Sequence, residues 1–295
     1  MSELRVGVSG WAYPEWRGVV YPKGLVQKRE LEFLGKELNS IEINGTFYSL
    51  QTPKSFQKWS NETPDDLLFA VKGSKFITHQ KKLKDVEIPL ANFFASGLLC
   101  LGRKFGPLLW QFSPWLKFDA GRIETFLKLL PRTAAEAAKL AQQNTIKKPN
   151  GAFVELIEDV PLRYAFEPRH ESFFVEEFVE MLRKYDMALA FADTAEKFGY
   201  FEDVTADFIY IRLHGDEELY VSDYRDAELD RWARRIKAWQ EGSEPKDAKK
   251  ITKVKPRIQE RDVYVYFDNS MEGHAFFDAK YLAEKLGVQS KSPAK

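Results

Sequence analysis

The chain has 295 residues with 44 basic and 44 acidic side chains, so its formal net charge is zero. This balance argues against a general nucleic-acid binder, which usually has a basic excess, and gives no support for adhesion to an anionic membrane. The length allows one large domain or two ordinary ones, and it suffices for a sizeable core without metal or disulfides.

Aromatic side chains make up 14% of the chain, which a large core or an aromatic-walled pocket would explain. The single cysteine, Cys100, lies in the apolar run Leu98–Leu101. This setting favours an inert core thiol, and the lack of a disulfide partner favours a reducing compartment. The first residues have no signal-peptide layout, and no apolar stretch approaches the ~20 residues of a membrane span. We therefore expect a cytoplasmic protein.

Eight short apolar runs with polar or turn residues at their ends are typical of buried strands. They are Leu4–Ser9, Ser40–Asn44, Leu67–Lys72, Leu108–Phe112, Arg163–Glu167, Ala188–Asp193, Phe208–His214 and Val263–Asp268. Helical patterns fill most of the intervals, at Lys28–Glu37, Pro53–Asn61, Ala91–Leu101, Gly121–Gln143, Phe173–Tyr185, Ala227–Trp239 and a last helix that includes Tyr281–Leu286.

This alternation predicts a parallel sheet, and eight repeats predict an α/β fold of the TIM-barrel-like (β/α)8 type, for which about 250 residues is typical. The interval 193–207 is too short for a long helix, so that repeat should be degenerate. An open doubly wound sheet is the alternative. However, no Gly-x-Gly-x-x-Gly turn follows the first strand, which counts against a dinucleotide-binding fold.

Two segments lack a regular period. Asn144–Pro161 joins a long helix to the fifth strand, and Glu241–Arg261 is charged and contains two prolines, which predicts a mobile loop. Neither segment is typical of a domain linker. We therefore expect one barrel domain over residues 1–289, followed by a frayed tail at 290–295.

Polar side chains gather where the predicted strands end. Side chains alternate between the two faces of a strand, and in the seventh strand one face is aliphatic while Tyr210, Arg212 and His214 share the other. The aliphatic face should meet the helices, so the polar face should point into the barrel. The same reasoning places one set at the carboxyl ends of the strands: Ser9, Glu42, Asn44, Lys72, Gln111, Glu167, Arg169, Asp193, Arg212, His214 and Asp268. Barrel enzymes place their chemistry at this end.

All four histidines, His79, His170, His214 and His274, also end or follow a predicted strand. Seven motifs include or follow the ends of predicted strands. They are Gly7-Val-Ser-Gly-Trp-Ala-Tyr-Pro-Glu-Trp16, Glu42-Ile-Asn-Gly-Thr-Phe-Tyr48, Phe69-Ala-Val-Lys72, Leu109-Trp-Gln-Phe-Ser-Pro114, Phe166-Glu-Pro-Arg-His170, Tyr210-Ile-Arg-Leu-His-Gly215 and Val265-Tyr-Phe-Asp-Asn269. In this order and spacing, over nearly the whole chain, they resemble the YecE-like proteins, a bacterial and archaeal family of unknown function.

The resemblance implies a TIM-barrel-like fold and supplies no established reaction. The chain departs from the pattern at two places. Asp268-Asn269 stands where two asparagines are expected, and Phe173 stands where a tryptophan is common. Asp268 thereby adds a carboxylate to the expected site.

The first functional hypothesis is an enzyme that acts on a small anionic substrate, phosphorylated or sugar-like, by acid/base hydrolysis or isomerisation. Lys72, Arg169 and Arg212 would hold the anion. Glu42 or Glu167 would act as acid or base, and His214 or His170 would shuttle a proton. The remaining candidates for substrate binding are Trp11, Asn44, Tyr48, His79, Gln111, Asp193, Asp268 and Asn269.

A divalent metal is a variant of this hypothesis, with Glu167, His170, Asp193 and His214 as candidate ligands for manganese or zinc. The sequence has no His-Glu-x-x-His motif, no cysteine cluster and no nucleotide-cofactor motif.

Three alternatives remain open. Aromatic residues that follow the first two strands, Trp11, Tyr13, Trp16, Tyr21, Phe47 and Tyr48, could stack on the bases of a nucleic acid or could pack the top of the barrel. The barrel could bind a ligand without catalysis. The charged ring could also be an ion-pair network that supports the barrel mouth.

Overall fold

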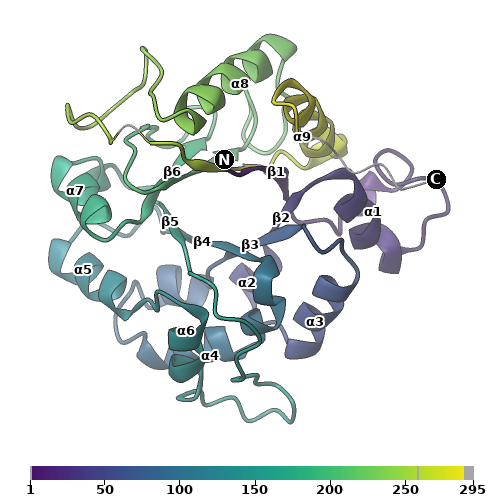
Figure 1. Cartoon of the computed structure of the whole chain (residues 1–295), viewed down its shortest axis with the longest axis vertical. Coiled ribbons are helices and arrows are strands. Elements are labelled where there is room, and N and C mark those ends of the chain that lie inside the picture. Colours follow the sequence, from purple (N-terminus) through teal and green to yellow (C-terminus); the bar gives the residue numbers. More distant parts are fainter. Residues whose placement is uncertain (1, 258, 289–295) are drawn as a thin grey trace. The chain divides into compact units, whose positions relative to one another are not determined.

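Eight parallel strands follow one another in chain order and form a closed barrel (Figure 1). The computed structural model describes residues 2–257 and 259–288. The strands are β1 (Leu4–Ser9), β2 (Ser40–Ile43), β3 (Leu68–Lys72), β4 (Phe105–Gln111), β5 (Tyr164–Glu167), β6 (Ala188–Asp193), β7 (Phe208–Leu213) and β8 (Asp262–Phe267). The closed barrel confirms the predicted (β/α)8 fold and excludes the alternative of an open sheet. The largest difference between a predicted and an observed strand boundary is in the fourth strand, which begins at Phe105 instead of Leu108.

Helices occupy most of the intervals between the strands. They are α1 (Glu30–Glu37), α2 (Gly45–Tyr48), α3 (Pro53–Asn61), α4 (Glu87–Ala95), α5 (Ala120–Leu129), α6 (Ala134–Ala141), α7 (Glu176–Lys184), α8 (Asp226–Gln240) and α9 (His274–Lys285). Residues 194–207, all of them described, form no helix, as expected of the degenerate repeat. None of the helices in the described residues is long and apolar enough to cross a membrane.

The predicted helix Ala91–Leu101 is wrong in its bounds, because α4 ends at Ala95 and a separate 3-10 helix, η4, spans Leu98–Lys104. Gly97 separates the two helices with a φ of 120°, a conformation that favours glycine over other residues. A Cβ at this position would also lie 2.6 Å from the Pro53 Cα.

The predicted long helix Gly121–Gln143 is interrupted, because α5 ends at Leu129 and α6 begins at Ala134. Pro131 cannot donate a backbone hydrogen bond inside a helix, and it holds the preceding Leu130 in an extended conformation. Thr133 then caps α6, since its side chain accepts from the Glu136 amide. Both signals were present in the sequence, but the apolar spacing concealed them.

The contacts of the chain divide into two compact units, which we describe separately. The first unit comprises the described residues among 1–42 and 174–295, and the second comprises 43–173. This division reflects how the contacts are distributed along the chain. It does not test the expectation of one domain over residues 1–289, which stays a prediction. The expected tail at 290–295 lies outside the described residues.

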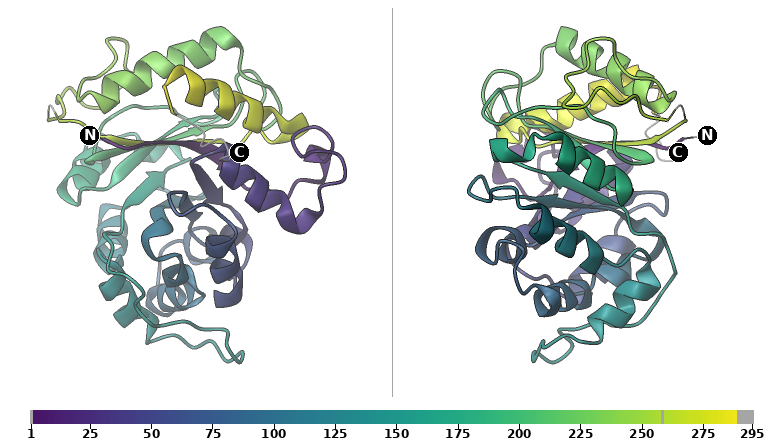
Figure 2. Two further views of the ribbon diagram at one scale, coloured as in Figure 1. Left: turned by 45° about the vertical axis from the view of Figure 1, so that its right-hand side comes forward. Right: turned by 90° about the vertical axis from the view of Figure 1, so that its left-hand side faces the viewer.

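In the first unit, the strands pair in the order β6, β7, β8, β1 and β2. Helix α8 packs against β8, and α9 packs against α8, β8 and β1 (Figure 2). The apolar side of α8 contains Trp232, Ile236 and Trp239, which recur at helical spacing and are buried. These aromatics belong to the core that the composition suggested.

Gly7 allows β1 and β2 to approach closely. A Cβ on Gly7 would lie 1.9 Å from the Ser40 carbonyl oxygen, which is rigid backbone. We expect Gly7→Ala to lower the free energy of unfolding by about 1–3 kcal/mol, as overpacking of a filled interior does. Urea unfolding measures this change. Gly121→Ala is the matched control, because the nearest atom to its added Cβ is 3.7 Å away. Equal unfolding midpoints for the two variants would contradict the predicted clash.

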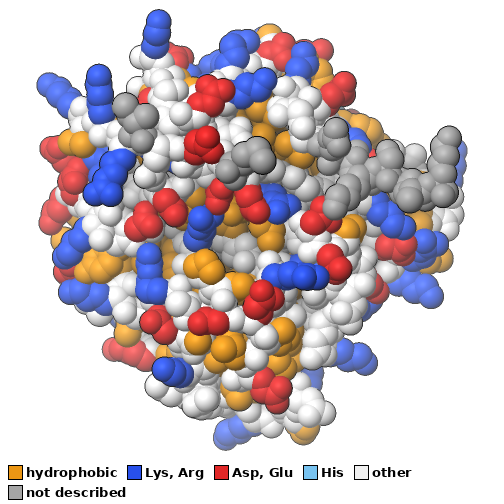
Figure 3. Space-filling model, viewed as in Figure 1, with side chains coloured by type: hydrophobic (Ala, Val, Ile, Leu, Met, Phe, Trp, Pro, Cys, Tyr) orange, Lys and Arg blue, Asp and Glu red, His pale blue; other side chains and the backbone are white. Residues whose placement is uncertain are grey.

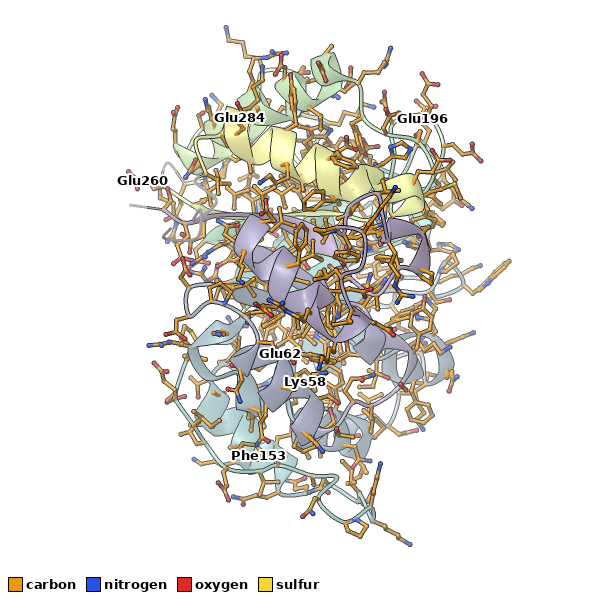
Figure 4. The ribbon with its side chains drawn as sticks, turned by 90° about the vertical axis from the view of Figure 1, so that its right-hand side faces the viewer. Lys58, Glu62, Phe153, Glu196, Glu260 and Glu284 are labelled. Carbon is orange, nitrogen blue, oxygen red and sulfur yellow. The ribbon has the colours of Figure 1, made fainter. Side chains whose placement is uncertain are left out.

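In the second unit, β4 pairs with β3 on one side and β5 on the other. Trp110 of β4 is buried between helices, with its ring centroid 5.6 Å from Phe93 of α4 and 5.2 Å from Phe126 of α5. Cys100 in η4 is buried, and burial raises the pKa of its thiol to about 11, which agrees with the expected inert core cysteine. At the end of α3, Lys58 and Glu62 form an ion pair of 3.8 Å (Figure 4).

Candidate functional site

Glu42 is the second-to-last residue of β2. Its carboxylate is buried and accepts three hydrogen bonds within the first unit. The Ser9 hydroxyl donates to Oε1 at 2.7 Å, and the Tyr210 hydroxyl donates to Oε2 at 2.6 Å. Arg212 donates from Nη2 to Oε1 at 2.9 Å. These contacts confirm the predicted orientation of Ser9, Glu42 and Arg212 toward one another.

Arg212 of β7 connects Glu42 to a second carboxylate. Its Nη2 donates to Asp268 Oδ2 at 2.8 Å, while Nη1 lies 3.3 Å from His214 Nε2. A guanidinium only donates, so His214 Nε2 accepts and the imidazole proton lies on Nδ1. That Nδ1 is 3.2 Å from Asp268 Oδ2. His214 is therefore oriented by its hydrogen bond with Arg212, and the Asp268 carboxylate lies within ion-pair distance of its Nδ1.

The aromatic residues of the first loop mostly pack inside the first unit. Trp16 and Tyr21 are buried, and Trp16 donates from its indole to the Ser270 carbonyl at 2.6 Å. Tyr13 packs against Trp16 with ring centroids 4.8 Å apart, and burial together with Asp268 raises the pKa of its phenol. Trp16 and Tyr21 are thus not available to stack on bases, whereas Trp11 is partly exposed.

Asp193 and Asn269 belong to a separate hydrogen-bond network of the first unit. Tyr224 donates from its hydroxyl to Asp193 Oδ2 at 3.1 Å. Asn269 is buried and donates to Asp278 Oδ2 at 2.8 Å and to the Ser222 carbonyl at 2.9 Å. Burial is the main cause that raises the pKa of both carboxyls, Asp193 and Asp278, to about 6. No sequence pattern indicated Tyr224 or Asp278, because each lies 11 residues beyond the end of the preceding strand.

In the second unit, Glu167 at the end of β5 is buried and accepts two hydrogen bonds on Oε1. Gln111 of β4 donates from Nε2 at 2.8 Å, and Arg169 donates from Nε at 2.9 Å. The register pairs Gln111 directly with Glu167, which explains why the two side chains meet. The structure thus brings these three of the predicted site residues together.

Lys72 at the end of β3 is buried against an aromatic ring. Its Nζ lies 4.6 Å from the centroid of Phe47, and the His79 ring packs edge-on against the same Phe47 at 5.2 Å. Thr46 fixes Phe47 in this place, because its hydroxyl donates to the Lys72 carbonyl at 2.6 Å. His79 Nδ1 also lies 2.8 Å from the Thr78 hydroxyl. Lysine, histidine and phenylalanine thus form one packed group.

The pKa of His79 depends on the burial and on the charges around this group. Its pKa is lowered to about 4, first by burial and then by the charges of Arg169 and Lys72. Lys75 lowers the pKa further, while Glu167 raises it. His79 is therefore neutral at pH 7, and the cations around it dominate the local potential.

The remaining predicted residues of the second unit, Tyr48, Asn44 and His170, differ in exposure. Tyr48 is 68% exposed, and the Lys75 ammonium lies 5.1 Å above its ring. Asn44 precedes α2, and its carbonyl accepts from the Phe47 amide. His170 is partly buried and accepts on Nδ1 from the Ser172 amide at 3.1 Å. Trp115 follows β4 and is 81% exposed, a feature that the sequence pattern did not reveal.

The structure gives no support to the metal variant. Among residues 2–257 and 259–288, no group of three or more His, Cys, Asp or Glu side chains has an arrangement that could hold a metal ion. We therefore derive no step from a metal.

Comparison with known proteins decides the family. A family model described as "Protein of unknown function DUF72" matches residues 5–295. The chain belongs to the DUF72 family. Among its relatives, the UPF0759 protein YunF of Bacillus subtilis is 22% identical, over 97% of this chain and 95% of YunF. The UPF0759 protein YecE of Escherichia coli K12 is 29% identical, over 37% of this chain and 43% of YecE.

Two solved DUF72 structures have the same fold. A DUF72 family protein of Thermotoga maritima is 24% identical with a TM-score of 0.71, and the match covers 97% of this chain and 99% of that one. A DUF72 family protein of Enterococcus faecalis is 15% identical with a TM-score of 0.69, and the match covers 99% of both chains. The expected resemblance to YecE-like proteins is thus confirmed. These likenesses establish the fold, and the names describe no activity.

Proposed function

We propose that this DUF72 protein is an enzyme whose substrate is a small anion, and that Lys72 and Arg169 hold the anionic group. The placement of these two cations supports the proposal most directly. Both follow or end parallel strands of the second unit, at the carboxyl ends where barrel enzymes bind substrates. After burial, the charges of these two residues are the largest causes that lower the pKa of His79, so positive charge lies close to that imidazole.

The surroundings of Arg169 suit it for binding a planar anion. Its Nε is engaged by Glu167, which fixes the orientation of the guanidinium. An oriented guanidinium binds carboxylate or phosphate by parallel hydrogen bonds, whereas Lys72 supplies a point charge. His79 is neutral and can therefore donate one hydrogen bond and accept another. We assign these three residues to substrate binding.

Glu167 is the better candidate for proton transfer. Glu42 is buried and accepts hydrogen bonds from Ser9, Tyr210 and Arg212, so we assign it to the positioning of Arg212. Glu167 is hydrogen-bonded to Arg169, one of the two cations assigned to the anion, and its charge acts on His79. His170 has its Nδ1 occupied by a backbone amide, so its Nε2 can donate a proton. This arrangement is compatible with acid/base hydrolysis or isomerisation.

Calorimetric titration with phosphate and sulfate tests the binding step. We expect Lys72→Met and Arg169→Met each to weaken binding at least tenfold, because a hydrogen bond to a charged group contributes about 1.5–3 kcal/mol. Arg103→Met is the matched control, since Arg103 is an exposed cation that precedes β4 at the opposite end of the strand. Binding that is absent in the wild type, or that is lost equally in the control, would contradict the proposal.

The complete pairing of Glu42 favours a second candidate, a non-catalytic barrel that binds an anion and is supported by an ion-pair network. Glu167→Gln separates the two candidates. If the protein is an enzyme, this variant should bind a phosphate ester while its turnover falls by about 10²–10⁴-fold. If no bound ester is turned over by the wild type, the binding barrel is the better account.

A further inference from the structure

The balanced total charge conceals a strongly basic segment in the first unit. Residues 245–257 contain one acidic side chain, Asp247, and these basic ones: Lys246, Lys249, Lys250, Lys253, Lys255 and Arg257. Helix α8, which precedes the segment, adds Arg231, Arg234 and Arg235. We call these residues together the basic face. Blue side chains gather at the upper left of Figure 3, over the loop that follows α8 in Figure 1.

A cavity joins the two parts of the basic face. It has a volume of about 300 Å³ and is lined by Arg231, Arg234, Arg235, Ala238, Pro245 and Asp247. Arg235 is buried and bound to Glu202 through Nε at 2.9 Å, while its Nη1 donates to Asp247 at 2.7 Å. Arg235 therefore holds Asp247, another residue of the cavity lining, close to α8. Arg234 is exposed at its opening.

Buried carboxylates hold the backbone of the segment in place. Asp203 is fully buried and accepts from the amides of Ile251 at 2.6 Å and Thr252 at 3.0 Å. Glu202 is equally buried and accepts from the amide of Lys249 at 2.9 Å. The segment expected to be a mobile loop is thus anchored at its middle. Anchoring the backbone reduces the ordering cost that a flexible basic loop would incur on binding.

Four lysines of the anchored segment are exposed, although the Nζ of one of them, Lys249, lies 5.9 Å from the centroid of the Tyr200 ring. Lys246, Lys249, Lys253 and Lys255 are exposed, while the intervening Thr252 is buried. Their charges recur every two to four residues along an irregular, non-helical stretch. A series of spaced cations matches a linear polyanion better than it matches one small anion.

We propose that the basic face binds the phosphate backbone of a nucleic acid without reading its sequence. The residues argue for this partner over an anionic membrane. Of the large apolar side chains exposed in the described residues, only Val254 lies on the segment, whereas an interfacial membrane contact uses several apolar side chains. The inference is independent of the small-anion site, which lies in the second unit.

A labelled 20-base-pair DNA duplex tests the proposal by fluorescence anisotropy. With about four phosphate contacts, we expect the affinity of the full chain to fall about 100-fold between 50 and 200 mM salt. The variant with Arg234, Lys249, Lys253 and Lys255 all replaced by serine should lose at least ~30-fold in affinity at 50 mM salt, and its salt slope should fall by about 3 to 4.

The matched control replaces four exposed lysines of the second unit, Lys54, Lys58, Lys84 and Lys128, by serine. It changes the net charge equally and should retain the wild-type affinity. The thermal midpoints of both variants show whether they are folded. Equal losses in the two variants would overturn the proposal, because they would reflect net charge alone. Binding to phosphatidylserine vesicles or to inorganic phosphate without binding to the duplex would also overturn it.

Discussion

Arg212→Met should lower the free energy of unfolding by about 3–5 kcal/mol, the range measured when one partner of a buried ion pair is removed. The substitution would leave Glu42 fully buried without its cation. It would also remove the hydrogen bond to Asp268 at 2.8 Å and the contact with His214. Methionine has a similar volume and no charge, so the loss would come mainly from the uncompensated charge. Urea unfolding, followed by circular dichroism, measures the change.

Arg225→Met is the control for this prediction. Arg225 forms an ion pair with Asp216 at 3.1 Å, but 68% of its side chain is exposed. Water screens such a pair, so the unfolding midpoint should remain nearly unchanged. If Arg212→Met were as mild as the control, the network around Glu42 would not be a structural support of the first unit.

The pKa of His79 should move in opposite directions in two variants. Arg169→Met removes a cation that lowers this pKa, so the pKa should rise from about 4 toward the ordinary value of about 6.5. It should not reach that value, because burial is the largest cause of the shift. Glu167→Gln removes a carboxylate that raises the pKa, so the pKa should fall below about 4.

Proton NMR measures both shifts, and the chain has only four histidines, so their ring signals can be separated. His79→Gln identifies the signal, and Arg103→Met should leave it unchanged. The same direction of shift in both variants would show that repacking, and not charge, controls the environment of His79. The positive potential assigned to Lys72 and Arg169 would then lack support.

The inner face of the barrel could be predicted from the sequence because strands alternate with a fixed period of two. That period identified Glu42, Arg212 and Asp268 before their contacts were known, and it did the same for Gln111 and Glu167. The helix bounds were less predictable. Apolar spacing continued across Pro131, although the conformation of a proline outweighs the pattern around it.

Contacts that loop and helix residues make with the strand ends could not be predicted. The sequence placed Asp193 and Asn269 at strand ends, but not the bonds to Tyr224 and Asp278 that tie them to other elements. It also placed a charged segment at Glu241–Arg261 without showing that buried Asp203 fixes its backbone. Such partners depend on how loops return to the core, and a local pattern holds no information about that path.

If Lys72, Arg169 and His79 bind an anion, sulfate should change the pKa of His79, and a titration of this histidine in sulfate measures the change. Sulfate stays fully charged over the relevant pH range, so a chloride titration at the same ionic strength is the reference. A bound anion stabilises the imidazolium, so sulfate should raise the pKa of His79 from about 4, and this rise should be absent in Arg169→Met. If the pKa of His79 is the same in sulfate and in chloride, these three residues do not bind the anion.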